Sequence, residues 1–119
     1  MTRILLAEDD ESMRGFLRRA LERAGHEVVE FANGRDALDR LLVEPFDLLL
    51  TDIVMPIMDG IELARHASEH DPALRIMFIT GFAVVTLETD SRQVREARVL
   101  SKPFHLKDLV DEVERVLAA

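Results

Sequence analysis

The chain has 119 residues, of which 48% are hydrophobic and 32% are charged, as in a globular protein of one domain with a sizeable core. Its net charge of −8 disfavours a nucleic-acid surface, because phosphates would be repelled, and the absence of cysteine excludes disulfides and thiolate metal sites. The longest uncharged stretch, residues 76–87, is shorter than the roughly 20 residues of a membrane span, and the N-terminus does not resemble a signal peptide, so we predict a cytoplasmic protein without a membrane span.

Short apolar runs alternate along the chain with longer segments of helical spacing. The runs are short and mostly unbroken, which is typical of strands buried on both faces of a parallel sheet. We predict these strands at residues 3–7, 27–31, 47–51, 75–79 and 97–100.

Between the strands, apolar residues recur at three- and four-residue steps, which predicts amphipathic helices. Gly25 is a predicted C-cap of the first helix, and Asp59 is a predicted N-cap of the third. Residues 83–95 have little amphipathic order and predict a poorly formed helix. The apolar stripes comprise Met13, Phe16, Leu17, Ala20, Leu21 and Ala24; Ala37, Leu38, Leu41 and Leu42; Ile61, Ala64 and Ala67; and Leu106, Leu109, Val110, Val113 and Leu117.

Strand and helix alternate along the whole chain, which predicts an α/β fold with a doubly wound, five-stranded parallel sheet. Of the common strand orders, the flavodoxin-like order 2-1-3-4-5 fits five strands best. In that order the first and third strands are neighbours, and ligands bind beyond the carboxyl ends of the strands. We therefore expect the functional residues at that edge of the sheet.

Polar side chains stand at the carboxyl ends of four predicted strands. They are Glu8, Asp9 and Asp10 after the first, Asp52 after the third, Thr80 after the fourth, and Ser101 and Lys102 after the fifth. Carboxylates crowded into one crevice require positive charge, and oxygen ligands without nearby histidine or cysteine favour Mg²⁺. A carboxylate beside Mg²⁺ and a lysine can attack a phosphoryl group, so we predict that Asp52 forms an aspartyl phosphate.

Four motifs at these strand ends resemble those of the receiver domains of two-component response regulators. They are ILLAEDD at 4–10, LLLTDIVMPIMDG at 48–60, IMFITG at 76–81 and LSKP at 100–103. The resemblance covers the whole chain and implies the CheY-like form of the predicted fold. It also implies Mg²⁺ as the cofactor and a histidine kinase or histidine phosphotransferase as the phosphodonor.

The resemblance assigns a role to each of the matching residues. Asp52 is the expected phosphoacceptor, Thr80 the switch hydroxyl, and Lys102 the lysine that contacts the phosphoryl group. Pro103 is expected in a cis peptide, although a proline could also simply begin the last helix. Asp10 lies outside the matching set and is expected to be an N-cap or a solvated acid of the first helical turn. The expected Mg²⁺ ligands are Glu8, Asp9, Asp52 and the backbone carbonyl of Val54.

The chain departs from the family pattern at three positions. Val99 stands where an aromatic residue usually rotates inward on activation, so a rotating-tyrosine switch is excluded. Val54 and Phe82 are apolar at the two positions that flank the attacking water, which predicts slow hydrolysis of the aspartyl phosphate.

We expect the four histidines, at positions 26, 66, 70 and 105, to lie on the surface, and Met55 and Met58 to pack within a loop.

Three other functions compete with a phosphorylation-switched receiver. A phosphatase with an aspartyl intermediate would need an acid two residues after the nucleophile, where Val54 stands. A flavodoxin-like FMN binder would need hydroxyl- and glycine-rich phosphate contacts, whereas EDDES at 8–12 would repel a phosphate. A pseudo-receiver, which keeps the fold without phosphorylation, is opposed by the complete acceptor set. We therefore predict a signalling protein and not an enzyme.

The sequence ends with the last predicted helix, so we expect a single receiver domain at 1–119, without an output domain, that acts through protein contacts. Within the family the chain most resembles a stand-alone receiver of alphaproteobacteria that acts with the ClpXP protease. That resemblance implies ClpX as a partner and a role as an adaptor in regulated proteolysis; a phosphate shuttle or sink in a phosphorelay is the alternative. The terminal Leu117, Ala118 and Ala119 also resemble a degradation tag, although alanines can simply finish a helix.

Overall fold

A five-stranded parallel sheet runs through the middle of the computed structural model, which describes residues 1–81 and 91–119. The strands lie in the order β2-β1-β3-β4-β5, which confirms the predicted doubly wound topology. Three strands differ by a residue from their predicted ends, so that Asp52, Thr80 and Ser101 belong to strands. The strands are β1 (Arg3–Ala7), β2 (Glu27–Phe31), β3 (Leu48–Asp52), β4 (Arg75–Thr80) and β5 (Arg98–Ser101).

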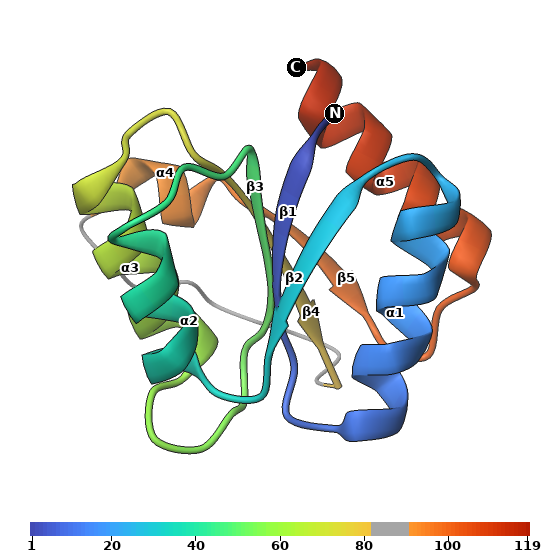
Figure 1. Ribbon diagram of the computed structural model, residues 1–119, viewed down its shortest axis with the longest axis horizontal. Coiled ribbons are helices and arrows are strands. Elements are labelled where there is room, and N and C mark those ends of the chain that lie inside the picture. The colour runs from blue at the N-terminus through green and yellow to red at the C-terminus, as the bar shows by residue number, and fades with distance from the viewer. Residues whose placement is uncertain (82–90) are drawn as a thin grey trace.

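Helices cover both faces of this sheet (Figure 1). On one face lie α1 (Glu11–Arg23) and α5 (Leu106–Ala118), and on the other lie α2 (Gly34–Leu41), α3 (Gly60–His70) and α4 (Arg92–Arg95). Within the described residues, no helix is both long enough and apolar enough to cross a membrane.

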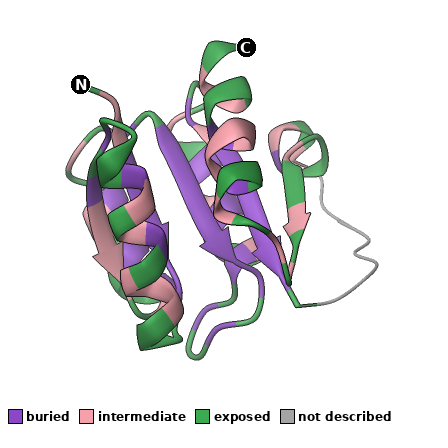
Figure 2. Cartoon of the chain, turned by 90° about the vertical axis from the view of Figure 1, so that its right-hand side faces the viewer, coloured by how far each residue is buried: buried purple, intermediate pink, exposed green. Residues whose placement is uncertain are grey.

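Alternate strand residues supply the two layers of the core. Leu5 and Leu49 pack toward α2 and α3, whereas Ile4, Leu48 and Leu50 pack toward α1 and α5. Because both faces of the inner strands are covered, these strands are apolar along their length, and Figure 2 shows them buried. The edge strand β5 is mostly exposed.

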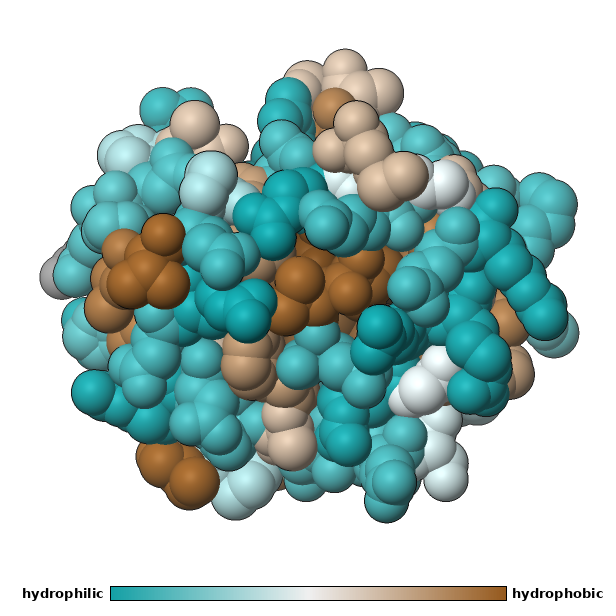
Figure 3. Space-filling view, viewed as in Figure 1, coloured by the Kyte–Doolittle hydropathy of each residue, from teal (hydrophilic) through white to brown (hydrophobic). Residues whose placement is uncertain are grey.

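The other edge of the sheet is formed by β2. Figure 3 shows a hydrophobic strip over this strand, between hydrophilic side chains of α1 and α2. Charged side chains border the strip, because Glu30 of β2 pairs with Arg14 and Arg18 of α1. Paired charges along an edge strand hinder the addition of a strand from another chain.

The helix boundaries follow local sequence signals. Asp10, Asn33 and Asp59 cap α1, α2 and α3 by accepting a hydrogen bond from a backbone N–H in the first turn. Gly25 has a φ of 100°, as expected of a left-handed residue after a helix. These caps confirm the predicted roles of Asp10 and Asp59, whereas the C-cap of α1 is Ala24 and Gly25 is the left-handed residue that follows it.

Several predicted helix faces are only partly buried. Phe16 is 47% exposed, and Leu42, which is the C-cap that follows α2, is 45% exposed. Leu63, which the predicted stripe of α3 omitted, is fully buried. Of the predicted weak helix at 83–95, the structure shows α4 at its end; residues 82–90, with Phe82, lie outside the described residues.

The prediction that all four histidines lie on the surface is wrong for His26. This side chain is buried, and its Nε2 lies 2.7 Å from Oε1 of Glu114 on α5. The turn after α1 directs His26 inward, and α5 then covers it, a contact between residues far apart in the sequence. His70 and His105 are exposed, as predicted, and His66 is half-buried.

Candidate functional site

The carboxyl ends of four neighbouring strands bring the predicted site residues to one edge of the sheet. Asp52 and Thr80 are the last residues of β3 and β4, and Glu8 and Lys102 directly follow β1 and β5. Parallel pairing places equivalent strand ends side by side: Ala7 lies opposite Thr51, and Asp52 lies opposite Ile79. Residues that are widely separated in the sequence thus surround one crevice.

Lys102 joins two of the carboxylates. Its Nζ donates to Oε1 of Glu8 and to Oδ2 of Asp52, at 2.9 Å in both cases. The carboxylates of Glu8 and Asp52 are buried, and the Lys102 side chain is 24% exposed. Charge-assisted hydrogen bonds of this length in a partly dry setting hold the ammonium group in place. The peptide bond between Lys102 and Pro103 is cis, as predicted.

Backbone contacts set the positions of the other site residues. The N–H of Val54 donates to Oδ1 of Asp52 at 3.2 Å, so each oxygen of this carboxylate has a donor. Thr80 is fully buried, and its carbonyl accepts a hydrogen bond of 2.6 Å from the N–H of Lys102. The structure therefore brings together Glu8, Asp52, Val54, Thr80 and Lys102.

Glu8, Asp9 and Asp52 form an acidic pocket that could hold a cation. One carboxylate oxygen from each residue lies within 4.8 Å of the others. The second oxygen of Glu8, Oε2, is buried and has no hydrogen-bond partner within the described residues, which is costly unless a proton or a cation binds there. An all-oxygen donor set suits Mg²⁺. These observations fit the predicted magnesium site.

The pocket perturbs the ionisation of Glu8 and Lys102. Burial, reinforced by the neighbouring Asp52, raises the pKa of Glu8 to about 8, although Lys102 opposes the shift. Burial by itself would lower the pKa of Lys102, but the hydrogen bonds with Asp52 and Glu8 outweigh it, so this pKa is raised. A divalent cation favours the charged form of Glu8, which means that metal binding releases a proton below about pH 8.

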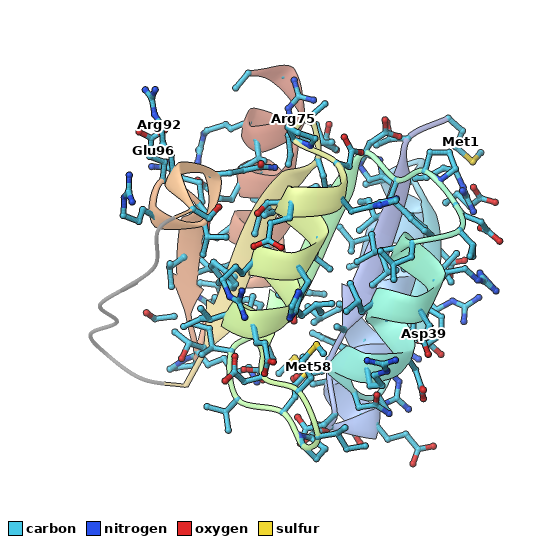
Figure 4. The ribbon with its side chains drawn as sticks, turned by 90° about the vertical axis from the view of Figure 1, so that its left-hand side faces the viewer. Met1, Asp39, Met58, Arg75, Arg92 and Glu96 are labelled. Atoms are coloured by element: carbon cyan, nitrogen blue, oxygen red, sulfur yellow. The ribbon has the colours of Figure 1, made fainter. Side chains whose placement is uncertain are left out.

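The loop between β3 and α3 returns to the strand end from which it starts. The N–H of Gly60 donates to the carbonyl of Ile53 at 2.8 Å, and a Cβ on Gly60 would lie 2.0 Å from the carbonyl oxygen of Asp52. Met58 is buried in this loop and lies beside the ends of α2 and α3 (Figure 4), which confirms its predicted packing role. Gly60 was not among the predicted site residues, although the Asp-Gly pair at the start of a helix was an available signal.

Replacing Gly60 by Ala is expected to displace the Asp52 backbone and to lower the free energy of unfolding by about 2–4 kcal/mol, because the clash involves rigid main chain on both sides. Urea denaturation measures this effect. Gly81→Ala is the matched control, since a Cβ at Gly81 meets no atom of residues 1–81 or 91–119 within 4 Å. Equal stability of the two variants would show that the loop can move away from Asp52.

This chain matches a protein-family model and a full-length relative. The model described as response regulator receiver domain matches residues 4–114. The response regulator receiver protein CpdR of Brucella abortus is 66% identical over 119 residues, which are 100% of this chain and 99% of that protein.

Solved structures of similar proteins share the fold. A CheY-like receiver domain protein of Methanospirillum hungatei is 29% identical with a TM-score of 0.90, over 99% of this chain and 94% of that one. The response regulator TrrA of Thermotoga maritima, solved in complex with Mg(2+)-BeF, is 26% identical with a TM-score of 0.85, over 98% of this chain and 99% of that one. The comparison agrees with the topology of the sheet.

Proposed function

The chain belongs to the response regulator receiver family of two-component systems, and from that membership we propose that Asp52 accepts a phosphoryl group from a histidine phosphorelay in the presence of Mg²⁺. Phosphoryl acceptance is general for the family. The contact of Lys102 with both Glu8 and Asp52 carries the proposal, because it places a fixed positive charge beside the candidate nucleophile.

Each residue has a distinct part in the proposed transfer. A carboxylate oxygen of Asp52 attacks the phosphorus, the bond from phosphorus to the donor histidine nitrogen breaks, and its electron pair returns to the imidazole. Lys102 and the hydroxyl of Thr80 then bind oxygens of the new phosphoryl group. Glu8, Asp9, Asp52 and the Val54 carbonyl would hold Mg²⁺, which neutralises negative charge on the phosphoryl oxygens when bound.

The proposed output is a change of protein contacts. The full-length identity of 66% with the receiver protein CpdR supports the output that the sequence resemblance implies, and we propose that this chain is an adaptor for the ClpXP protease. In this proposal the unphosphorylated protein engages ClpX. Phosphorylation replaces the single negative charge of the Asp52 carboxylate by a phosphoryl group with nearly two negative charges, which reorganises Thr80 and Lys102 and releases the partner. A histidine kinase or histidine phosphotransferase supplies the phosphoryl group.

A binding measurement tests the adaptor role. Purified ClpX is expected to bind the untreated protein and to bind about tenfold more weakly after treatment with acetyl phosphate and Mg²⁺. The Asp52→Asn variant, given the same treatment, should keep the affinity of the untreated protein. If ClpX binds neither form of the wild type, the adaptor role is wrong and the phosphate shuttle or sink becomes the better account. If treatment with acetyl phosphate and Mg²⁺ leaves the affinity of the wild type for ClpX unchanged, the proposed control of ClpX binding by phosphorylation is wrong.

A further inference from the structure

Arg14, in the first turns of α1, contacts the backbone of the acidic pocket. Its Nη1 donates to the carbonyl oxygen of Glu8 at 2.9 Å. The N–H of Glu8 continues the β1–β2 ladder by donating to the carbonyl of Phe31 at 3.0 Å, but β2 ends at Phe31. Arg14 thus donates a hydrogen bond to the carbonyl of Glu8 at the point where β2 no longer supplies a backbone donor.

The guanidinium of Arg14 is itself held in place. Its Nε lies 4.0 Å from Oε2 of Glu30, and the side chain is only 18% exposed. Arg18 contacts the other oxygen of Glu30 at 3.2 Å. Oε2 of Glu30 is buried and has no hydrogen-bond partner among the residues that the structure describes. The positive charge of Arg14 therefore compensates the negative charge on this oxygen. The contact with β2 therefore determines where Arg14 presents its donors.

The carbonyl that Arg14 contacts belongs to the peptide bond between Glu8 and Asp9. A peptide bond is planar, so fixing its carbonyl also fixes the direction in which the chain enters Asp9. Glu8 and Asp9 supply two of the three carboxylates that lie within 4.8 Å of one another. Any rotation of this peptide would separate oxygens that must converge on one cation.

We propose that Arg14 is a positioning residue of the acidic pocket, which orients Glu8 and Asp9 for a divalent cation through the peptide bond that joins them. The inference rests on the proposed magnesium site but adds a residue that contacts neither the cation nor the phosphoryl group. A positioning residue differs from a purely structural link between α1 and β2, because it changes the metal affinity of the folded protein.

The test compares Arg14→Met with Arg18→Ala by NMR. Methionine keeps an apolar stem but cannot donate to Glu8, whereas Arg18 shares the Glu30 partner and has no bond to Glu8. In Arg14→Met the Kd for Mg²⁺, measured without a phosphodonor, is expected to rise about tenfold, and the Asp9 amide resonance should shift in the metal-free protein. In Arg18→Ala, the Kd for Mg²⁺ and the Asp9 amide resonance should stay close to those of the wild type.

Arg14→Lys provides a second variant with the charge retained. A lysine ammonium can reach one partner but cannot imitate the guanidinium fork between Glu8 and Glu30, so partial rescue of the Kd is expected. A Kd in Arg14→Met equal to that of Arg18→Ala, with both variants folded, would overturn the inference. Absence of Mg²⁺ binding by the wild type would instead refute the magnesium site of the proposed function. Should Arg14→Met not fold, Arg14→Lys must still show a raised Kd.

Discussion

Replacing Asp52 by Asn is expected to abolish phosphoryl labelling by acetyl phosphate, which in the wild type should reach one group per chain and require Mg²⁺. The amide oxygen of Asn carries no charge and is a poor nucleophile, although its shape is close to that of the carboxylate. Intact mass measurement detects the added phosphoryl group directly. The Asp52 carboxylate is buried beside Lys102, a setting that no exposed carboxylate in the described part of the chain shares.

Asp10 offers a matched control for this substitution. It lies two residues after Glu8, and its carboxylate caps α1 by accepting from the N–H of Met13 at 2.9 Å. Asn caps a helix about as well as Asp, so Asp10→Asn should keep the fold and the labelling. Labelling of Asp52→Asn to the level of wild type would place the acceptor at another residue.

Replacing Glu8 by Gln is expected to raise the free energy of unfolding of the metal-free protein by about 2 kcal/mol at about pH 9. The pKa of Glu8 is about 8 in the folded protein and about 4.5 in the unfolded chain. Between these pH values the folded protein therefore binds more protons than the unfolded chain. Stability of the wild type must then fall as pH rises from about 4.5 through about 8. Gln has no proton to lose, and its amide offsets only part of the lost bond with Lys102.

Urea denaturation at several pH values measures this effect. The difference between Glu8→Gln and wild type should be small at about pH 4.5 and should grow toward about pH 9. Saturating Mg²⁺ is the control. A cation bound by the wild type favours the charged carboxylate of Glu8, so it should raise the free energy of unfolding of the wild type and remove the difference from Glu8→Gln. The free energy of unfolding of Glu8→Gln should change little. Parallel stability curves for the two proteins without Mg²⁺ would contradict the raised pKa.

The strands and their order could be predicted because their signals are local. Unbroken apolar runs indicate strands buried on both faces, and the alternation with helices leaves few topologies. The same local signals predicted Asp52, Thr80 and Lys102 at one edge of the sheet, since the carboxyl ends of parallel strands meet there. The caps at Asp10 and Asp59 were equally accessible, because a cap depends on the next three residues.

Predictions failed where a side chain meets an element far away in the sequence. Spacing placed Phe16 in the apolar stripe of α1, but only the packing angle of the helix decides that it is 47% exposed. Nothing near His26 in the sequence indicates burial, which results from α5 and its Glu114. The partners of one side chain in another element are set by the whole arrangement of helices on the sheet.

The sequence by itself determined the fold class, the strand order and the types of residue at the site, because periodicity, caps and strand ends are properties of short segments. Only the tertiary structure decided that Lys102 joins Glu8 and Asp52, that Gly60 must lack a side chain against Asp52, and that Arg14 holds the Glu8 carbonyl. The contacts of Lys102 and Arg14 have lengths of 2.9 Å, and at Gly60 a Cβ would lie 2.0 Å from the Asp52 carbonyl oxygen. Such distances depend on how β1, β3, α1 and the strand-end loops pack together, which no local pattern specifies.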